Sequence, residues 1–135
     1  MIKLKFVYGV LPCVVQYTDN LPEWCGGRAI YNFIQIRPKY LSDTGLLTHE
    51  LTHVKQCYRG LFLIYGIRYK FFKDSRFNYE LEAYVSQIKA YGSMSKEELM
   101  KKIELFAKFI SEKYKLDKSV GECESALTIK LLLNR

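Results

Sequence analysis

The chain has 135 residues, of which 49% are hydrophobic and 26% are charged. This balance is typical of a soluble globular domain, and it excludes an intrinsically disordered segment. The length allows a hydrophobic core to form without disulfide or metal staples, so we predict a single domain over residues 1–135.

The formal net charge of +7 would attract an acidic partner, a nucleic acid or an anionic membrane. Because the sequence has no dense run of basic residues interleaved with stacking aromatic residues of the kind that single-strand binders use, nucleic-acid binding is not favoured as the primary function. The chain has four cysteines: Cys13, Cys25, Cys57 and Cys123. They form no C-x-x-C pair, which argues against a zinc ribbon or a disulfide framework. We expect reduced thiols, although an even count also allows two disulfides.

No segment has the pattern of a signal peptide or a transmembrane helix. Lys3 and Lys5 precede the apolar stretch Phe6–Val15, but Pro12 interrupts this stretch and no cleavage site of small residues follows. The other apolar run, Leu61–Ile67, is far too short to cross a bilayer. We therefore expect a cytoplasmic protein.

Two β-strands are predicted in the first third of the chain. Ile2–Tyr8 contains β-branched and aromatic residues and ends at Gly9 and Pro12. After a loop punctuated by proline and glycine, Ala29–Arg37 has the pattern of a second strand, which Pro38 stops. Its moderate polarity is typical of an edge strand.

The rest of the chain is predicted to be mainly helical, over Asp43–Arg59, Leu61–Phe72, Arg76–Tyr91 and a segment from Ser95 to about Tyr114. The first of these helices has N-cap candidates in residues 42–44 and Gly60 beyond its end. Ser95 and Glu98 form a capping box that opens the last one. Glu122–Leu133 fits either a helix or a strand.

The first predicted helix contains the motif H-E-x-x-H, at His49, Glu50 and His53. Residues four apart lie on one face of a helix, so the two imidazoles can converge on one tetrahedral metal ion. Glu50 points away from that line and could reach a water molecule bound to the metal. A zinc ion in such a site lowers the pKa of this water, and Glu50 could then act as general base.

A catalytic zinc needs a third protein ligand, and the chain has no other histidine. Helical periodicity places Glu80 at the border of the buried stripe of its helix and Glu82 on the polar side, which favours Glu80. Cys57 continues the line of the two histidines by one turn. A straight helix cannot wrap three turns around one ion, so we expect Cys57 to be a buried free thiol.

The segments HELTHVKQ, residues 49–56, and YELEAY, residues 79–84, resemble the small gluzincin-type metallopeptidases. In that family H-E-x-x-H supplies two ligands, and a glutamate in an E-x-x-A context supplies the third, which matches Glu80 and Ala83 here. The strand before the motif helix is similar to the edge strand that borders the family's cleft and pairs with extended substrate. The resemblance covers residues 28–90, and Tyr84 stands where one large branch of the family has aspartate.

We therefore expect an α+β, zincin-like domain, in which a small antiparallel sheet with an edge strand packs on an active-site helix and further helices follow. The resemblance implies a zinc-dependent metallohydrolase that cleaves peptide bonds in a peptide or protein substrate. In it His49, His53 and Glu80 bind Zn²⁺, and Glu50 is general base and then acid. Tyr65, Tyr69, Tyr79 and Tyr84 are unranked candidates for stabilising the oxyanion.

Two other functions fit the same sequence. The first is a binding module that keeps zinc for stability and lacks turnover. The second is a basic adaptor for a membrane or a nucleic acid, because five basic residues oppose only Asp74 between Arg59 and Arg76. Together with the apolar segment Leu61–Phe72, these charges could form a face for a membrane surface.

Overall fold

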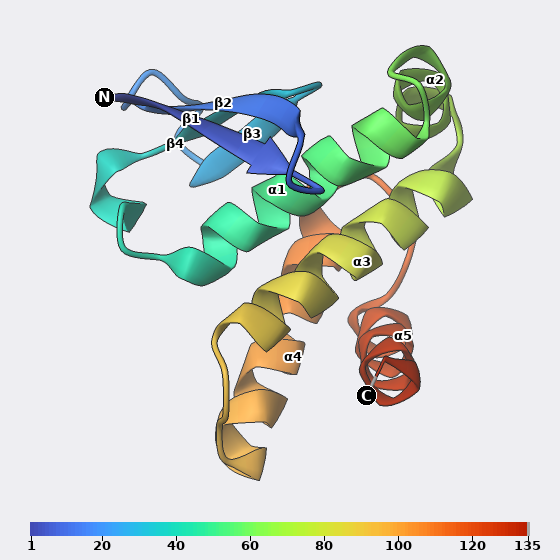
Figure 1. Ribbon diagram of the computed structural model, residues 1–135. Coiled ribbons are helices and arrows are strands. Elements are labelled where there is room, and N and C mark those ends of the chain that lie inside the picture. The colour runs from blue at the N-terminus through green and yellow to red at the C-terminus, as the bar shows by residue number, and fades with distance from the viewer. Residues whose placement is uncertain (135) are drawn as a thin grey trace.

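The computed structural model describes residues 1–134 as an α+β fold, with a sheet on one side and helices beneath it (Figure 1). The strands are β1 (Ile2–Val7), β2 (Leu11–Tyr17), β3 (Gly27–Ile30) and β4 (Phe33–Ile36). The helices are the short η1 (Pro38–Tyr40), α1 (Thr44–Arg59), α2 (Leu63–Phe71), α3 (Lys73–Ala90), α4 (Lys96–Lys113) and α5 (Val120–Leu133). The α+β class predicted from the sequence is confirmed.

The sheet is mixed, so the expected antiparallel sheet is wrong. Its strand order is β1-β2-β4-β3, in which β1 and β3 each run antiparallel to their neighbour while β2 and β4 are parallel. After β2 the chain passes to the outer edge and forms β3, and a hairpin then returns β4 between β3 and β2. This return makes β4 parallel to β2.

The single strand expected over Ala29–Arg37 is also wrong, because this segment is the hairpin of β3 and β4. The chain reverses at Tyr31 and Asn32, and Tyr31 has a left-handed backbone with φ of 56°. No glycine marks this turn, so the sequence pattern reads as continuous. The edge strand beside α1 is therefore β3, while β4 lies inside the sheet. Strand β2 was not predicted as a separate element.

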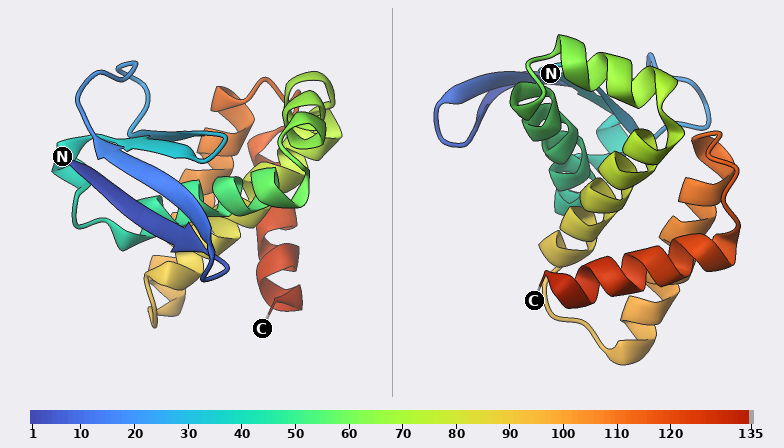
Figure 2. Two further views of the ribbon diagram at one scale, coloured as in Figure 1. Left: turned by 45° about the horizontal axis from the view of Figure 1, so that its top comes forward. Right: turned by 90° about the vertical axis from the view of Figure 1, so that its right-hand side faces the viewer.

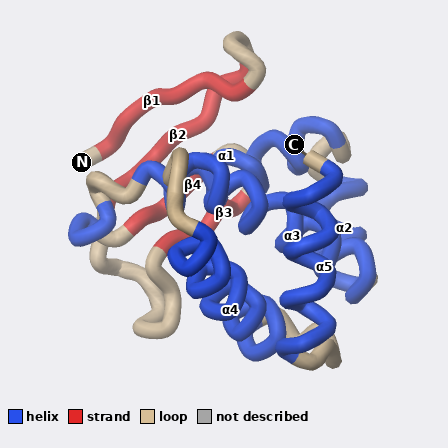
Figure 3. Tube along the Cα trace, turned by 90° about the horizontal axis from the view of Figure 1, so that it is seen from below, coloured by secondary structure: helices blue, strands red, loops and turns tan. Residues whose placement is uncertain are grey.

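Helix α1 lies between the sheet and α3 (Figures 1 and 2). Its apolar face, which includes Val54 and Leu51, packs on the inner face of the sheet against Val15, Ile34 and neighbouring side chains. The second core lies farther along the chain, between α3, α4 and α5, and includes Leu81, Ile88 and Ile110. Figure 3 shows the strands to one side of the helices. The fold thus has two cores that meet along α1 and α3.

The helix boundaries follow the predicted capping residues closely. Asp43 caps α1 by accepting a hydrogen bond from the Leu46 amide, and Gly60 follows the helix. Ser95 and Glu98 form the expected capping box. Glu122–Leu133, left open as helix or strand, belongs to α5, which opens with a second capping box at Ser119.

The structure also describes the state of the cysteines and the length and hydropathy of the helices. All four thiols are free and buried in the described chain. Within residues 1–134 no helix combines the length and the hydropathy needed to span a bilayer.

Candidate metal centre

Helix α1 presents His49 and His53 on one face, toward α3. Both side chains are buried, with 4% and 7% of their surface exposed, and their Nε2 atoms are 3.1 Å apart. The spacing of one helical turn therefore brings the two imidazole nitrogens to a common point, as the H-E-x-x-H pattern predicts.

Helix α3 brings Glu80 to the same point, where this side chain is fully buried. Its Oε2 lies 3.5 Å from His49 Nε2, and its Oε1 lies 3.4 Å from His53 Nε2. Ligand atoms bound at about 2.0 to 2.1 Å to a tetrahedral zinc ion are about 3.3 Å from one another. The distances between neighbouring ligand atoms are close to this value, and the three side chains form a group that could hold a metal ion.

The electrostatics of the group also fit a cation. Burial alone would raise the pKa of Glu80, but the imidazoles of His53 and His49 hold it well below its usual range. Burial alone would lower the pKa of His53, but Glu80 outweighs this effect and raises it to about 9. Glu80 Oε2 is buried and accepts no hydrogen bond. In the metal-free protein the protonated His53 imidazole offsets the buried charge of Glu80, and a bound cation would take over that role.

A network of hydrogen bonds behind His53 fixes the orientation of its ring. Gln56, on the next turn of α1, places its Oε1 2.9 Å from His53 Nδ1. Its amide nitrogen donates to the Tyr79 carbonyl and to Glu82 Oε2, and Arg59 in turn pairs with Glu82. Because Gln56 donates on one side, its carbonyl oxygen must accept from His53. His53 Nδ1 therefore keeps its proton, and Nε2 is the nitrogen that would give up its proton to bind a metal.

This arrangement separates the two glutamates that the sequence offered as ligands. Glu80 faces the imidazoles, whereas Glu82 holds Gln56 and Arg59. Sequence reasoning missed Gln56. The signal that could have found it is its spacing, because a polar residue three positions after His53 lies over the same side of the helix.

Helix α2 covers the group with two tyrosines. The Tyr69 hydroxyl donates to Glu80 Oε1 at 2.5 Å, and burial followed by the negative charge of Glu80 raises the pKa of Tyr69 far above its ordinary value. Tyr69 therefore stays a proton donor. Tyr65 lines the same cavity, Tyr79 packs against both rings, and Tyr84 packs edge-on against His49.

Glu50 lies where two cavities meet, of about 360 and about 330 Å³. Both cavities are lined by Glu50, His49, Gly27 and Trp24. Burial raises the pKa of Glu50, and the two imidazoles only partly offset this effect. A Cβ atom at Gly27 would lie 3.3 Å from Glu50 Oε1, so the glycine in β3 leaves room for this carboxylate. Trp24 lines both cavities, and 66% of its surface is exposed.

Cys57 does not join the group. Its side chain is 1% exposed, and burial raises the pKa of its thiol to about 11. The prediction that Cys57 is a buried free thiol is therefore confirmed.

No known protein is detectably similar to this chain. No family model, curated protein or solved structure matches the chain.

Proposed function

We propose that this protein is a zinc-dependent metallohydrolase that cleaves peptide bonds, with a zincin-like arrangement of its helix pair and edge strand. The observation that carries the proposal is the buried group of two imidazoles and one carboxylate. His49 Nε2 and His53 Nε2 are 3.1 Å apart, and each lies 3.5 or 3.4 Å from one oxygen of Glu80. Two imidazoles and one carboxylate form the ligand set of catalytic zinc sites that keep a fourth position for water.

A zinc ion held there would polarise a substrate carbonyl and lower the pKa of a coordinated water toward ~7. Glu50 follows His49 in the motif and faces the cleft, where it can accept the proton of the attacking water and pass it to the leaving amine. Burial raises the pKa of this carboxyl, which brings it closer to neutral pH and suits both transfers.

The cleft favours an extended polypeptide as substrate. Strand β3 is an edge of the sheet, and its residues Gly27, Arg28, Ala29 and Ile30 line the cavity that holds Glu50 and Glu80. An edge strand presents unpaired backbone groups that can bind an extended chain by hydrogen bonds. Tyr69 stays protonated and lines the same cavity, so by turning its hydroxyl from Glu80 toward the substrate it could donate to the developing oxyanion.

Replacing the proposed general base tests the catalytic step. We expect Glu50→Gln to retain one zinc per chain and to lose hydrolysis of a fluorogenic peptide mixture by a factor of about 10² to 10⁴. Glu104→Gln makes the same chemical change on the exposed surface of α4 and should keep full activity. Wild-type activity in Glu50→Gln would refute the mechanism.

Metal analysis of paired variants tests the ligand set. We expect Glu80→Gln to purify with little zinc and Glu82→Gln to retain one zinc per chain, because only Glu80 faces the imidazoles. Both substitutions remove one negative charge from the same helix, so they are matched. Retained zinc in the first variant with loss in the second would reverse the assignment.

A further inference from the structure

Helix α2 has two faces with different chemistry. Tyr65 and Tyr69 point inward and line the cavity beside His49, His53 and Glu80, called here the metal group. The opposite arc of the helix faces solvent and carries the apolar side chains of Leu63, Ile64, Ile67 and Phe71. Between 44% and 71% of the surface of each of these side chains is exposed. At 100° per residue these four positions fall within one 100° arc, so they form a single apolar stripe.

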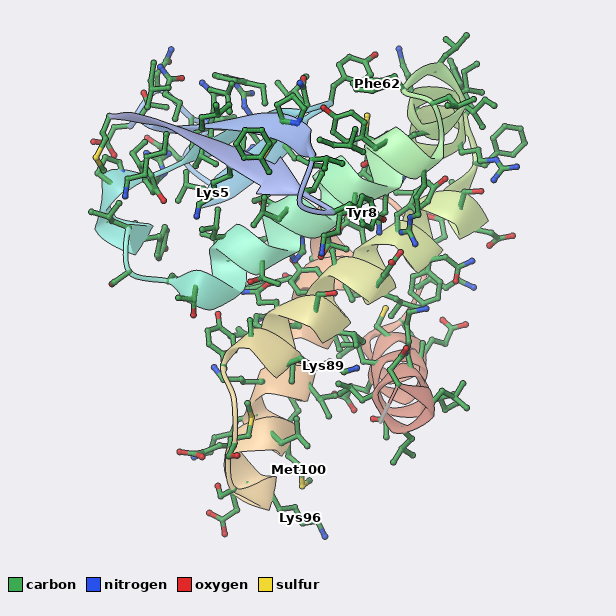
Figure 4. The ribbon with its side chains drawn as sticks, in the orientation of Figure 1. Lys5, Tyr8, Phe62, Lys89, Lys96 and Met100 are labelled. Carbon is green, nitrogen blue, oxygen red and sulfur yellow. The ribbon has the colours of Figure 1, made fainter. Side chains whose placement is uncertain are left out.

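The apolar surface continues beyond α2. Phe72, at the end of the helix, is 57% exposed. At the other end, the ring of Phe62 packs 5.8 Å from that of Tyr31 at the tip of the β3–β4 hairpin, where Ile30 and Tyr31 are also exposed. Figure 4 shows Phe62 at the corner where α1 meets α2. An exposed apolar surface of this extent marks an interaction site rather than ordinary surface.

The charges around this stripe are basic. Arg68 and Lys70 are exposed and flank the stripe on its two sides, and no acidic residue occurs between Glu50 and Asp74. An apolar stripe bordered by cations is the pattern of a helix that lies in the interface of a bilayer rich in anionic lipids. With nine residues, α2 is about 13 Å long and could lie only in the plane of such a membrane.

We propose that the outer face of α2, together with Ile30 and Tyr31, docks on the surface of a membrane that contains anionic lipids. The proposal does not depend on peptide hydrolysis, because it rests on the exposed residues of α2 and not on the metal group. Docking in this orientation holds the cavity behind Tyr65 and Tyr69 about one helix diameter, roughly 10 Å, from the lipid.

The charges favour lipid over a second copy of the chain. In a symmetric dimer through α2, each patch would meet itself, and Arg68 and Lys70 of one copy would approach those of the other. The nearest acidic residue in the sequence, Asp74, lies beyond the end of the helix. The cations would therefore repel one another in a dimer, whereas anionic headgroups would neutralise them.

Vesicle sedimentation tests the proposal, with phosphatidylcholine vesicles compared with vesicles that contain one quarter phosphatidylglycerol. Each cation near an anionic surface contributes about fivefold to partitioning, the equivalent of about 1 kcal/mol. We expect Arg68→Gln with Lys70→Gln to weaken binding to the anionic vesicles about 25-fold and to leave partitioning to phosphatidylcholine unchanged.

A second variant tests the apolar stripe. Leu63→Ser with Ile67→Ser and Phe71→Ser should reduce binding more than tenfold, and these exposed side chains are not part of either core. The matched control is Ile129→Ser with Leu132→Ser and Leu133→Ser, which removes three exposed apolar side chains from α5 and should bind as wild type.

Three results would overturn the proposal. One is wild-type protein that stays in the supernatant with the anionic vesicles, and another is an equal loss of binding in the α5 control. The third is a dimer, measured by light scattering, that the α2 serine variant converts to a monomer, because the stripe would then bind a second copy.

Discussion

Replacing Gln56 with leucine should weaken zinc binding without removing any ligand. The side chain is 1% exposed, and its Oε1 is the acceptor for His53 Nδ1. Leucine fills a similar volume but leaves this buried N–H without a partner, which costs about 1 to 3 kcal/mol. This cost corresponds to a zinc affinity that is about 5- to 150-fold lower. Losses of this size are found when the hydrogen-bond partner of a metal-bound histidine is removed.

Competition with a chromophoric zinc chelator measures the change in affinity. The matched control is Gln87→Leu, because Gln87 is also a buried glutamine but bonds to Tyr91, away from the metal group. Circular dichroism should show both variants folded. If Gln56→Leu binds zinc within threefold of wild type while Gln87→Leu does the same, the orienting role of Gln56 is refuted.

Four further outcomes follow from the same site and its surroundings. Because the metal-free His53 has a pKa of about 9, zinc binding at pH 7 should release close to one proton. The apparent affinity for zinc should also rise about tenfold per pH unit up to pH 9. Calorimetry in buffers of different ionisation enthalpy measures both. Free zinc at 100 times its Kd should stabilise the fold by about 2.7 kcal/mol and raise Tm by about 10 °C in a thermal melt, and a chelator should reverse the shift. Cys57→Ser should retain one zinc per chain by metal analysis, since the thiol is buried away from the group. Leu61→Gly should raise the free energy of unfolding in urea by about 0.5 to 1 kcal/mol, because Leu61 is exposed and has φ of 50°.

The parts of the site that lie within one helix could be predicted from the sequence. The i, i+4 spacing of His49 and His53 determines that their rings share a face once the helix forms, and the caps at Asp43 and Gly60 fix where it begins and ends. Glu80 was distinguished from Glu82 by helical periodicity alone, and the structure brings Glu80 to the histidines. Helical periodicity within the sequence was therefore enough to predict that His49, His53 and Glu80 form one group.

The parts that depend on contacts between distant segments could not be predicted. The turn at Tyr31 and Asn32 contains no glycine, so the pattern of β3 and β4 gave no reason to divide the strand. Placing β4 between β2 and β3 depends on side-chain packing in the sheet core, which a strand pattern does not encode. The contact of Tyr69 with Glu80 likewise requires the position of α2 against α3, and the four candidate tyrosines had equal claims before that position was known.

The position of His49, His53 and Glu80 relative to the two cores explains why a bound metal would matter to this fold. The histidines belong to α1, which is anchored to the sheet through Val54, whereas Glu80 belongs to α3, which is anchored to α4 and α5 through Leu81 and its neighbours. Each helix has an apolar core of its own, so neither needs a metal in order to form. The group lies between these cores, where a buried carboxylate faces two imidazoles. A cation bound there would join the two halves, because its ligands would come from both helices. Its binding energy would therefore appear mainly as resistance to the separation of α1 from α3.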